Sequence, residues 1–176
     1  IITKSGQEIG VAATKTFLTQ MQALYAIGIH LGFTSGSIDY PQLKTWESEI
    51  RKLPSKITQV LNNSESIKAL AAQFVNSKSV FFVGRNINYP LALEGALKLK
   101  EISYIHAEGF PAGELKHGPL ALLSEDTPVV AIAVQDHTYS KLISNIEEIS
   151  ARKTPVITLA QKGDELAKKV SDFCFE

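Results

Sequence analysis

The sequence predicts an α/β fold, a three-layer sandwich in which helices flank a parallel sheet. Short apolar runs recur through the second half of the chain. These runs lack the polar alternation of a half-exposed strand, so both faces of each strand should be buried. Segments with helical periodicity separate the runs, as the crossover connections of a parallel sheet require.

The chain is predicted to begin with a long helix. Apolar residues recur at helical spacing from residue 15 to residue 31, a pattern that favours a largely buried helix. Gly32 is the expected stop signal of this helix. The polar stretch 34–37 follows, and its Thr, Ser and Gly residues make it the best candidate for a linker.

A second helical region is predicted over residues 38–76. Breaks are expected at Pro54, because proline lacks a backbone N–H group, and at residues 62–64. Ser64 is the expected N-terminal cap of the last helical piece, because its hydroxyl can accept a hydrogen bond from the free N–H groups of a helix start.

Four buried strands are predicted after this helical region. They are expected at residues 79–84, 128–134 and 155–159, and from residue 173 onward. Helices are predicted between them at residues 89–102 and 138–152, with Asn88 capping the first and Asp164 capping a further short helix. Ligands of such sheets bind beyond the carboxyl ends of the strands, so the loop 84–86 is a candidate ligand-binding edge.

Composition limits the classes of function. Eighteen basic residues balance eighteen acidic ones, so the chain has no basic field with which to recruit nucleic acid or an anionic membrane. No apolar run approaches the roughly 20 residues of a membrane span. Cys174 is the only cysteine, which excludes a disulfide framework and fits a reducing cytoplasm. The four histidines lack the spacing of a metal site, and no metal or cofactor is expected.

The helix predicted at residues 89–102 carries an unusual charge pattern. Glu94, Lys98 and Glu101 fall on one narrow stripe, and apolar residues cover most of the remaining surface. A helix with such a surround should be buried, so its charges should face a pocket or one another. The spacing is also that of an internal ion-pair ladder, and the helix alone leaves both interpretations open.

The segment 104–119 is dense in ionisable side chains, glycine and proline, as functional loops often are. Within it, His117 has no apolar periodicity around it, which favours a functional histidine over one packed in the core. His106 follows an apolar residue in a short strand, and there the structural interpretation is preferred. Glu108 and Glu114 are interpreted as carboxylates that brace the loop.

Two long blocks and one upstream segment carry a resemblance to a known family. The blocks are ALEGALKLKEISY at residues 92–104 and AGELKHGPLAL at residues 112–122, and the upstream segment is EIGVAATK at residues 8–15. The blocks resemble the second sugar-isomerase (SIS) domain of the glutamine–fructose-6-phosphate aminotransferases. The upstream segment resembles the end of their first SIS domain. The resemblance therefore implies a boundary, with residues 1–36 ending the first domain and residues 37–176 forming a truncated second one.

This resemblance implies an enzyme of amino-sugar biosynthesis. Members hydrolyse glutamine in a separate domain and use the ammonia to convert fructose-6-phosphate to glucosamine-6-phosphate. By resemblance, Glu101 is the base that moves a proton between C1 and C2, and Lys98 is the lysine beside it. His117 matches the histidine that opens the sugar ring and reaches into the partner subunit, which implies a homodimer.

The resemblance also implies the residues that hold the substrate. Glu94 and Glu8 match carboxylates of the sugar pocket. Val11 and Ala12 match backbone positions that line it. The chemistry suits these residue types, because a carboxylate can remove a proton next to a carbonyl while a neighbouring ammonium polarises oxygen.

Two other functions remain open at this point. Another SIS enzyme, such as a fructosamine-phosphate deglycase, would use a similar base and histidine. A regulatory module that senses sugar phosphates would bind the ligand without chemistry. A purely structural dimerisation domain is a third hypothesis, but such a domain would not require a charged stripe that faces a pocket.

Three parts of the family pattern are expected to lie outside residues 1–176. They are the glutaminase domain, the phosphate-binding loops of the first SIS domain and the C-terminal lysine that forms a Schiff base. We therefore expect the purified 176-residue chain to be inactive and to bind fructose-6-phosphate poorly. Measurable turnover by this chain in a glucosamine-6-phosphate assay would contradict the expectation.

Overall fold

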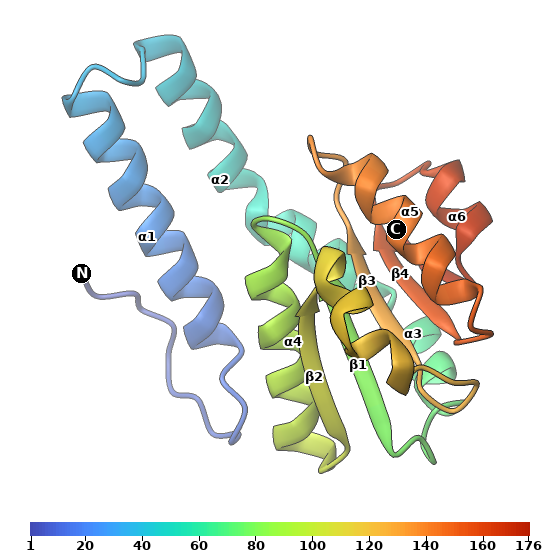
Figure 1. The fold of residues 1–176 in the computed structure, drawn as a ribbon. Coiled ribbons are helices and arrows are strands. Elements are labelled where there is room, and N and C mark those ends of the chain that lie inside the picture. Colours follow the sequence, from blue (N-terminus) through green and yellow to red (C-terminus); the bar gives the residue numbers. More distant parts are fainter. The chain divides into compact units, whose positions relative to one another are not determined.

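The computed structural model describes residues 1–176 and divides into two compact units. The first unit, Ile1–Gln73, is helical, and the second, Phe74–Glu176, contains the sheet (Figure 1). The boundary predicted after residue 36 separates two related domains rather than two compact units, and it stays a prediction. None of the helices combines the length and the apolar character needed to cross a bilayer.

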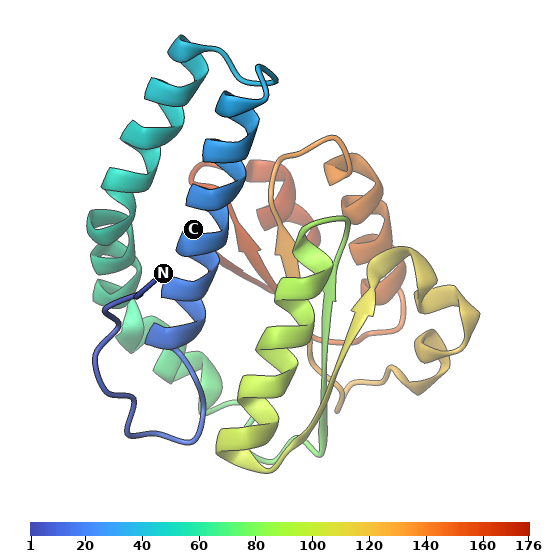
Figure 2. The same ribbon diagram turned by 90° about the vertical axis from the view of Figure 1, so that its left-hand side faces the viewer.

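The helical unit is built on a hairpin of α1 (Lys15–Thr34) and α2 (Tyr40–Asn62), which run side by side in Figures 1 and 2. The predicted first helix is confirmed, but its predicted burial is wrong. No residue of α1 is buried, and apolar side chains such as Leu24 and Leu31 are exposed. The reason is that α2 is the helix that packs along α1, and one neighbour cannot cover every side of a helix.

The second helix starts at a well-formed cap. The Asp39 carboxylate accepts the Gln42 N–H at 2.8 Å, and the Gln42 side chain accepts the Asp39 N–H at 3.0 Å. The break predicted at Pro54 is wrong, because α2 continues through it. The carbonyl that loses its donor there can be hydrated, since α2 has no buried residue.

The break predicted at residues 62–64 is confirmed, and α3 (Ser64–Ala71) follows it. The cap predicted at Ser64 is wrong, because Ser64 is already the first helical residue and no side chain caps this helix.

The second unit confirms the predicted α/β fold. Its sheet has five parallel strands in the order β2-β1-β3-β4-β5. The strands are β1 (Ser79–Gly84), β2 (His106–Pro111), β3 (Val129–Ala133), β4 (Val156–Ala160) and β5 (Phe173–Phe175). Most of β2 was predicted as loop. It pairs with β1 alone at the edge of the sheet, where glycine, proline and charged residues are tolerated.

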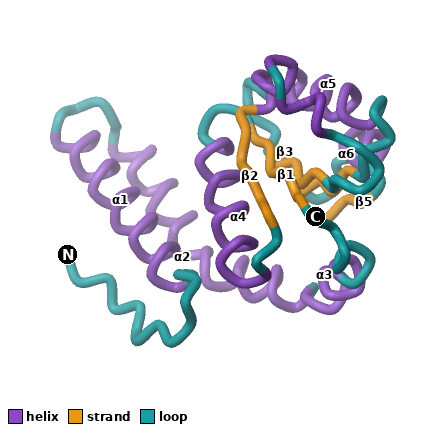
Figure 3. Tube along the Cα trace, turned by 60° about the horizontal axis from the view of Figure 1, so that its bottom comes forward, coloured by secondary structure: helices purple, strands orange, loops and turns teal.

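Helices cover both faces of this sheet. α4 (Asn88–Ser103) contacts β1, β2 and β3, whereas α5 (Tyr139–Ser150) and α6 (Glu165–Val170) together contact β3, β4 and β5. The chain leaves β1 toward one edge of the sheet and leaves β3 toward the other. Because parallel crossovers are right-handed, the two sets of helices lie on opposite faces, as Figure 3 shows.

The helix caps predicted in this unit have different outcomes. Asp164 caps α6 as predicted, since its carboxylate accepts the Ala167 N–H at 2.9 Å. The cap predicted at Asn88 is wrong, because Asn88 is the first residue of α4 and is buried.

The main core lies between the sheet and α5. It is made of buried apolar side chains from β1, β3, β4 and α5, joined by two residues of the segment that follows β2. These residues are Phe81, Val83, Val129, Ala131, Ala133, Val156, Leu142, Ile143, Ile146, Ile149, Ala112 and Leu115. The segment after β2 is therefore fixed by the core on the α5 face of the sheet.

On the opposite face, α4 approaches the sheet through small residues. Ala92 and Ala96 are buried, and Gly109 of β2 lies directly under Leu93. The prediction that α4 is buried on nearly all sides is wrong, because Leu97 and Ile102 are exposed. A narrow strip of small side chains is enough to pack α4 against the sheet, and the remaining sides of the helix are not covered by the chain.

The close approach at Gly109 generates a stability prediction. A Cβ at Gly109 would lie 2.8 Å from both Cα and N of Leu93, which are backbone atoms that cannot move aside. Gly109→Ala should therefore destabilise the protein by about 1–3 kcal/mol through overpacking. Urea unfolding monitored by circular dichroism measures the change.

The control is Gly28→Ala in α1, where no atom beyond the helix's own nearby backbone lies within 4 Å of the added Cβ. Alanine should stabilise this helix position by roughly 0.5–1 kcal/mol. Equal effects of the two substitutions would show that the α4–β2 contact is not close packed.

Candidate active site

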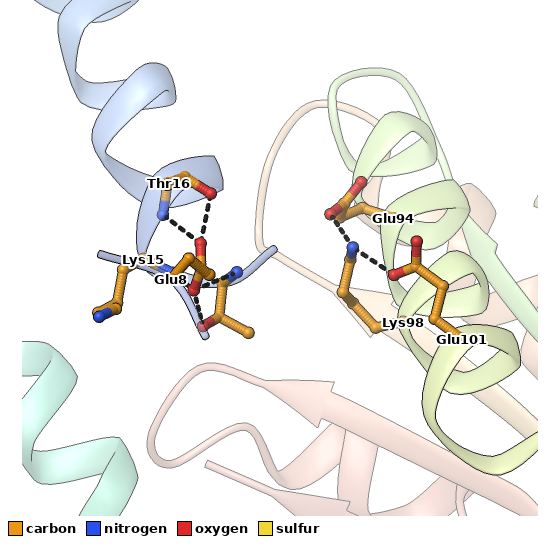
Figure 4. A network of polar contacts seen from close by, with 7 residues as sticks. Glu8, Lys15, Thr16, Glu94, Lys98 and Glu101 are labelled. Carbon is orange, nitrogen blue, oxygen red and sulfur yellow. Dashed lines mark hydrogen bonds and ion pairs between the residues drawn. The ribbon is translucent and has the colours of Figure 1, made fainter. Parts of the chain in front are cut away.

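Three charged side chains project together from one side of α4 (Figure 4). The Lys98 ammonium lies 2.8 Å from Glu101 Oε2 and 3.3 Å from Glu94 Oε1. The spacings are three and four residues, so the backbone of a single helix holds all three groups in register. The structure thus brings together three of the residues predicted for the site.

The stripe is partly shielded but open to a ligand. The exposed fractions of the side chains are 21% for Lys98, 24% for Glu94 and 29% for Glu101. The hydrogen bond to Glu101 raises the pKa of Lys98, although partial burial opposes this, so the lysine is charged at neutral pH. Glu101 Oε1 and Glu94 Oε2 accept no hydrogen bond within the chain, which leaves each carboxylate an oxygen for another molecule.

His117 is held apart from this stripe. It is the last residue of a short helical turn, η1 (Ala112–His117), which directly follows β2. Ala112 and Leu115 of this turn are buried. The imidazole is 73% exposed, and its nearest charged neighbour is Glu114, whose carboxylate lies 3.9 Å away. No hydrogen bond or ion pair joins it to the stripe of the same chain, so one copy does not assemble the whole predicted set.

Glu8 closes the start of α1 instead of standing free. Its Oε1 accepts hydrogen bonds from the N–H groups of Thr14 and Lys15, each at 3.1 Å, and from the Thr14 hydroxyl at 2.9 Å. Its Oε2 accepts the Thr16 N–H at 3.0 Å and the Thr16 hydroxyl. Both oxygens are therefore occupied by donors of the first turn, a favourable place for a negative charge.

These bonds fold the segment between Glu8 and α1 into a closed loop that contains Val11 and Ala12. Val11 is exposed and Ala12 is half-buried. The Thr16 hydroxyl bond, together with the backbone bonds, holds the pKa of Glu8 far below its ordinary value of 4.5. Glu8, Val11 and Ala12 belong to the helical unit, whereas the stripe and His117 belong to the unit with the sheet.

Two open grooves run along the hairpin of α1 and α2. Met21, Trp46 and Ile50 help to line one, and His30, Glu47 and Arg51 help to line the other. None of the predicted site residues lines either groove, so the grooves do not bear on the proposed chemistry.

The sequence profile that decides the family is that of the SIS domain, which matches residues 73–175. The chain belongs to the SIS domain family. The charged stripe of α4 and the loop that ends at His117 therefore both lie inside a SIS domain.

Two relatives are isomerising glutamine–fructose-6-phosphate aminotransferases. The chain is 54% identical over 97% of its length to the isomerising glutamine–fructose-6-phosphate aminotransferase of Methanosarcina acetivorans, and 48% identical over 99% to that of Aquifex aeolicus. It spans only 28% of the length of each of these relatives.

Solved SIS structures agree with the fold. The C-terminal domain of glucosamine–fructose-6-phosphate aminotransferase from Francisella tularensis superposes with a TM-score of 0.93 at 38% identity. The match covers 99% of this chain and 49% of that one. Tagatose-6-phosphate ketose/aldose isomerase from Escherichia coli matches with a TM-score of 0.69 at 19% identity, over 95% of this chain and 44% of that one, which shows the fold alone.

Sequence reasoning missed Asn145, a buried polar residue on the inner side of α5. A signal was present, because Asn145 stands among apolar residues at helical spacing, where a polar side chain needs a buried partner. Glu148 of the same helix is a partner of this side chain. Glu148 accepts a hydrogen bond from Asn145 and forms an ion pair with Lys116.

The Glu8 cap generates a pH prediction. Because folding lowers the pKa of Glu8, its contribution to stability is fully present above the unfolded-state value near 4.5 and declines as the pH falls toward the lower folded-state pKa. Glu8→Gln should therefore lower the thermal midpoint of the helical unit at neutral pH. The difference from the unsubstituted protein should shrink below about pH 4.5.

Circular dichroism melts from acidic to neutral pH measure this difference. Glu65→Gln is the matched comparison, since Glu65 is an exposed carboxylate in the first turn of α3 without a side-chain hydrogen bond or ion pair, and its smaller difference reports the helix-dipole contribution alone. A Glu8→Gln difference that is independent of pH would show that the carboxylate charge does not stabilise α1.

Proposed function

We propose that this chain is the isomerase part of a glutamine–fructose-6-phosphate aminotransferase, which forms glucosamine-6-phosphate from fructose-6-phosphate and glutamine-derived ammonia. The observation that carries the proposal is the α4 stripe, which lies in the SIS domain of a chain 54% identical to a relative of that name. The chain spans 28% of the length of that relative, and a glutaminase domain is proposed to lie in the remainder.

Glu101 is the proposed general base. Isomerisation removes a proton from a carbon next to a carbonyl and returns a proton to the neighbouring carbon. A carboxylate with one oxygen bonded to Lys98 and the other free can do both steps without leaving its place. Lys98, held in its charged form, stabilises the negative charge that develops on the substrate oxygen. Glu94 holds the other side of the ammonium and keeps it beside the substrate.

His117 is the proposed acid–base group for opening the sugar ring. A histidine can take up and release a proton near neutral pH. Because the imidazole is exposed and is not bonded to the stripe of its own chain, we place it in the site of a second copy. The proposed working form is therefore a homodimer.

The helical unit is proposed to supply the remaining contacts to the sugar. Val11 and Ala12 present backbone groups in the loop that Glu8 closes. Since both oxygens of Glu8 are occupied, Glu8 would act mainly by holding this loop in shape. No cofactor or metal enters the proposed mechanism, and the protein is proposed to work in the cytoplasm.

The central test is Glu101→Gln in the protein encoded by the complete open reading frame. Removing the base should lower kcat for glucosamine-6-phosphate formation by about 10²–10⁴-fold. Binding of fructose-6-phosphate should persist, because the amide keeps the size of the carboxylate. Solvent-deuterium incorporation at C1 or C2 should fall with kcat, and isothermal titration measures the binding.

Glu125→Gln is the control, since Glu125 is an exposed residue whose nearest charged partner lies 3.8 Å away. Full proton exchange by Glu101→Gln would overturn the assignment of the base. Release of an amine without consumption of glutamine would instead indicate a deglycase. Sugar binding without turnover in the unsubstituted protein would indicate a regulatory module.

A further inference from the structure

A chain of polar contacts joins the end of β1 to α5. Arg85 directly follows β1, and its Nη1 donates a hydrogen bond to Asn145 Oδ1 at 2.6 Å. Asn145 is a buried residue of α5, and its Nδ2 donates to Glu148 Oε2 at 3.3 Å. Both ends of the Asn145 amide are thus occupied, as a buried amide requires.

The same contacts reach the segment that carries His117. The Lys116 ammonium lies 2.7 Å from Glu148 Oε1, and this hydrogen bond lowers the pKa of Glu148. Lys116 is the residue immediately before His117. Glu148 therefore ties α5 to the position next to the histidine.

Arg85 also supports this segment by direct packing. A Cβ built on Gly113 would lie 2.9 Å from Arg85 Nη1 and 3.2 Å from Nη2, so a side chain at Gly113 would push the guanidinium out of its present place. The segment is therefore fixed by Arg85 at Gly113, by Glu148 at Lys116, and by the buried side chains of Ala112 and Leu115.

The histidine itself has no comparable support. Its imidazole is exposed, and the Glu114 carboxylate at 3.9 Å is too distant for a hydrogen bond. Gly118 follows with φ +136°, a conformation that other residues rarely adopt. The direction in which His117 projects is therefore set by how the preceding residues are held.

We propose that Arg85, Asn145 and Glu148 are positioning residues for His117: they clamp residues 113–116 to the end of β1 and to α5, and so aim the imidazole at its substrate. This inference rests on the proposed ring-opening role of His117. None of the three clamp residues touches the substrate in this account.

The clamp should affect rate more than stability. An ion pair as exposed as Lys116–Glu148 contributes little to folding, since its side chains are 57% and 33% exposed. A displacement of a catalytic group by about 1 Å can nevertheless lower a rate by about 10²-fold. A merely structural role would instead lower stability and affect every substrate alike.

Two substrates separate these roles in the full-length protein. Fructose-6-phosphate needs ring opening. Its 5-deoxy analogue lacks the hydroxyl that closes the furanose ring, so it is already open. Each variant is described by its kcat on the two substrates, relative to the unsubstituted protein, and by its thermal midpoint.

His117→Asn calibrates the assay and should lose activity on fructose-6-phosphate selectively. Arg85→Gln should show the same selectivity, with kcat on fructose-6-phosphate lowered about 10- to 100-fold and kcat on the open analogue within about threefold. Glu148→Gln should show a smaller selective loss with an unchanged thermal midpoint. Gly113→Ala should resemble Arg85→Gln, because the added methyl displaces the guanidinium.

Glu147→Gln is the matched control, because Glu147 is an exposed neighbour on the same helix without a hydrogen bond or ion pair. A selective loss in His117→Asn that is absent from Glu148→Gln and Gly113→Ala overturns the clamp and leaves the function of His117 standing. Equal losses on both substrates in His117→Asn overturn the ring-opening role, and the clamp with it. If Arg85→Gln does not fold, Glu148→Gln and Gly113→Ala still test the clamp.

Discussion

Lys98 lies between two carboxylates on α4, and the proposed chemistry depends on this contact. A single ammonium within 2.8 Å of Glu101 and 3.3 Å of Glu94 lets two negative groups share one side of a helix. Each carboxylate keeps an oxygen that no group of the chain occupies. The three side chains therefore form a local set of ion pairs in which one oxygen of each carboxylate has no hydrogen-bond partner. A substrate can bind to these two free oxygens.

The SIS domain holds its two candidate chemical groups by different means. The stripe lies on α4, which sits on one face of the sheet through a thin seam of alanine and glycine. The segment that ends at His117 is anchored in the core on the opposite face, with Arg85 and α5 as its supports. Because the two groups are held from opposite faces, each can be positioned without disturbing the other.

The sequence predicts the sheet and the stripe well, because both depend on local periodicity. Apolar runs identify β1, β3 and β4, and a spacing of three or four residues brings Lys98 to its partners on any regular helix. Features made by chain segments that return from a distance were not predictable. Glu8 caps a helix that starts several residues later, and Arg85 meets Asn145 from 60 positions away. The exposure of α1 also escaped prediction, since apolar periodicity indicates which side seeks a partner but not whether the chain supplies one.

The most direct measurement is a crystal structure of the full-length protein with fructose-6-phosphate bound. We expect the sugar to lie over the α4 stripe, with a Glu101 carboxylate oxygen about 3–3.5 Å from C1 or C2 and a His117 imidazole of a second copy near the ring oxygen. A sugar bound elsewhere, with Glu101 and Lys98 facing only solvent or protein, would contradict the central claim.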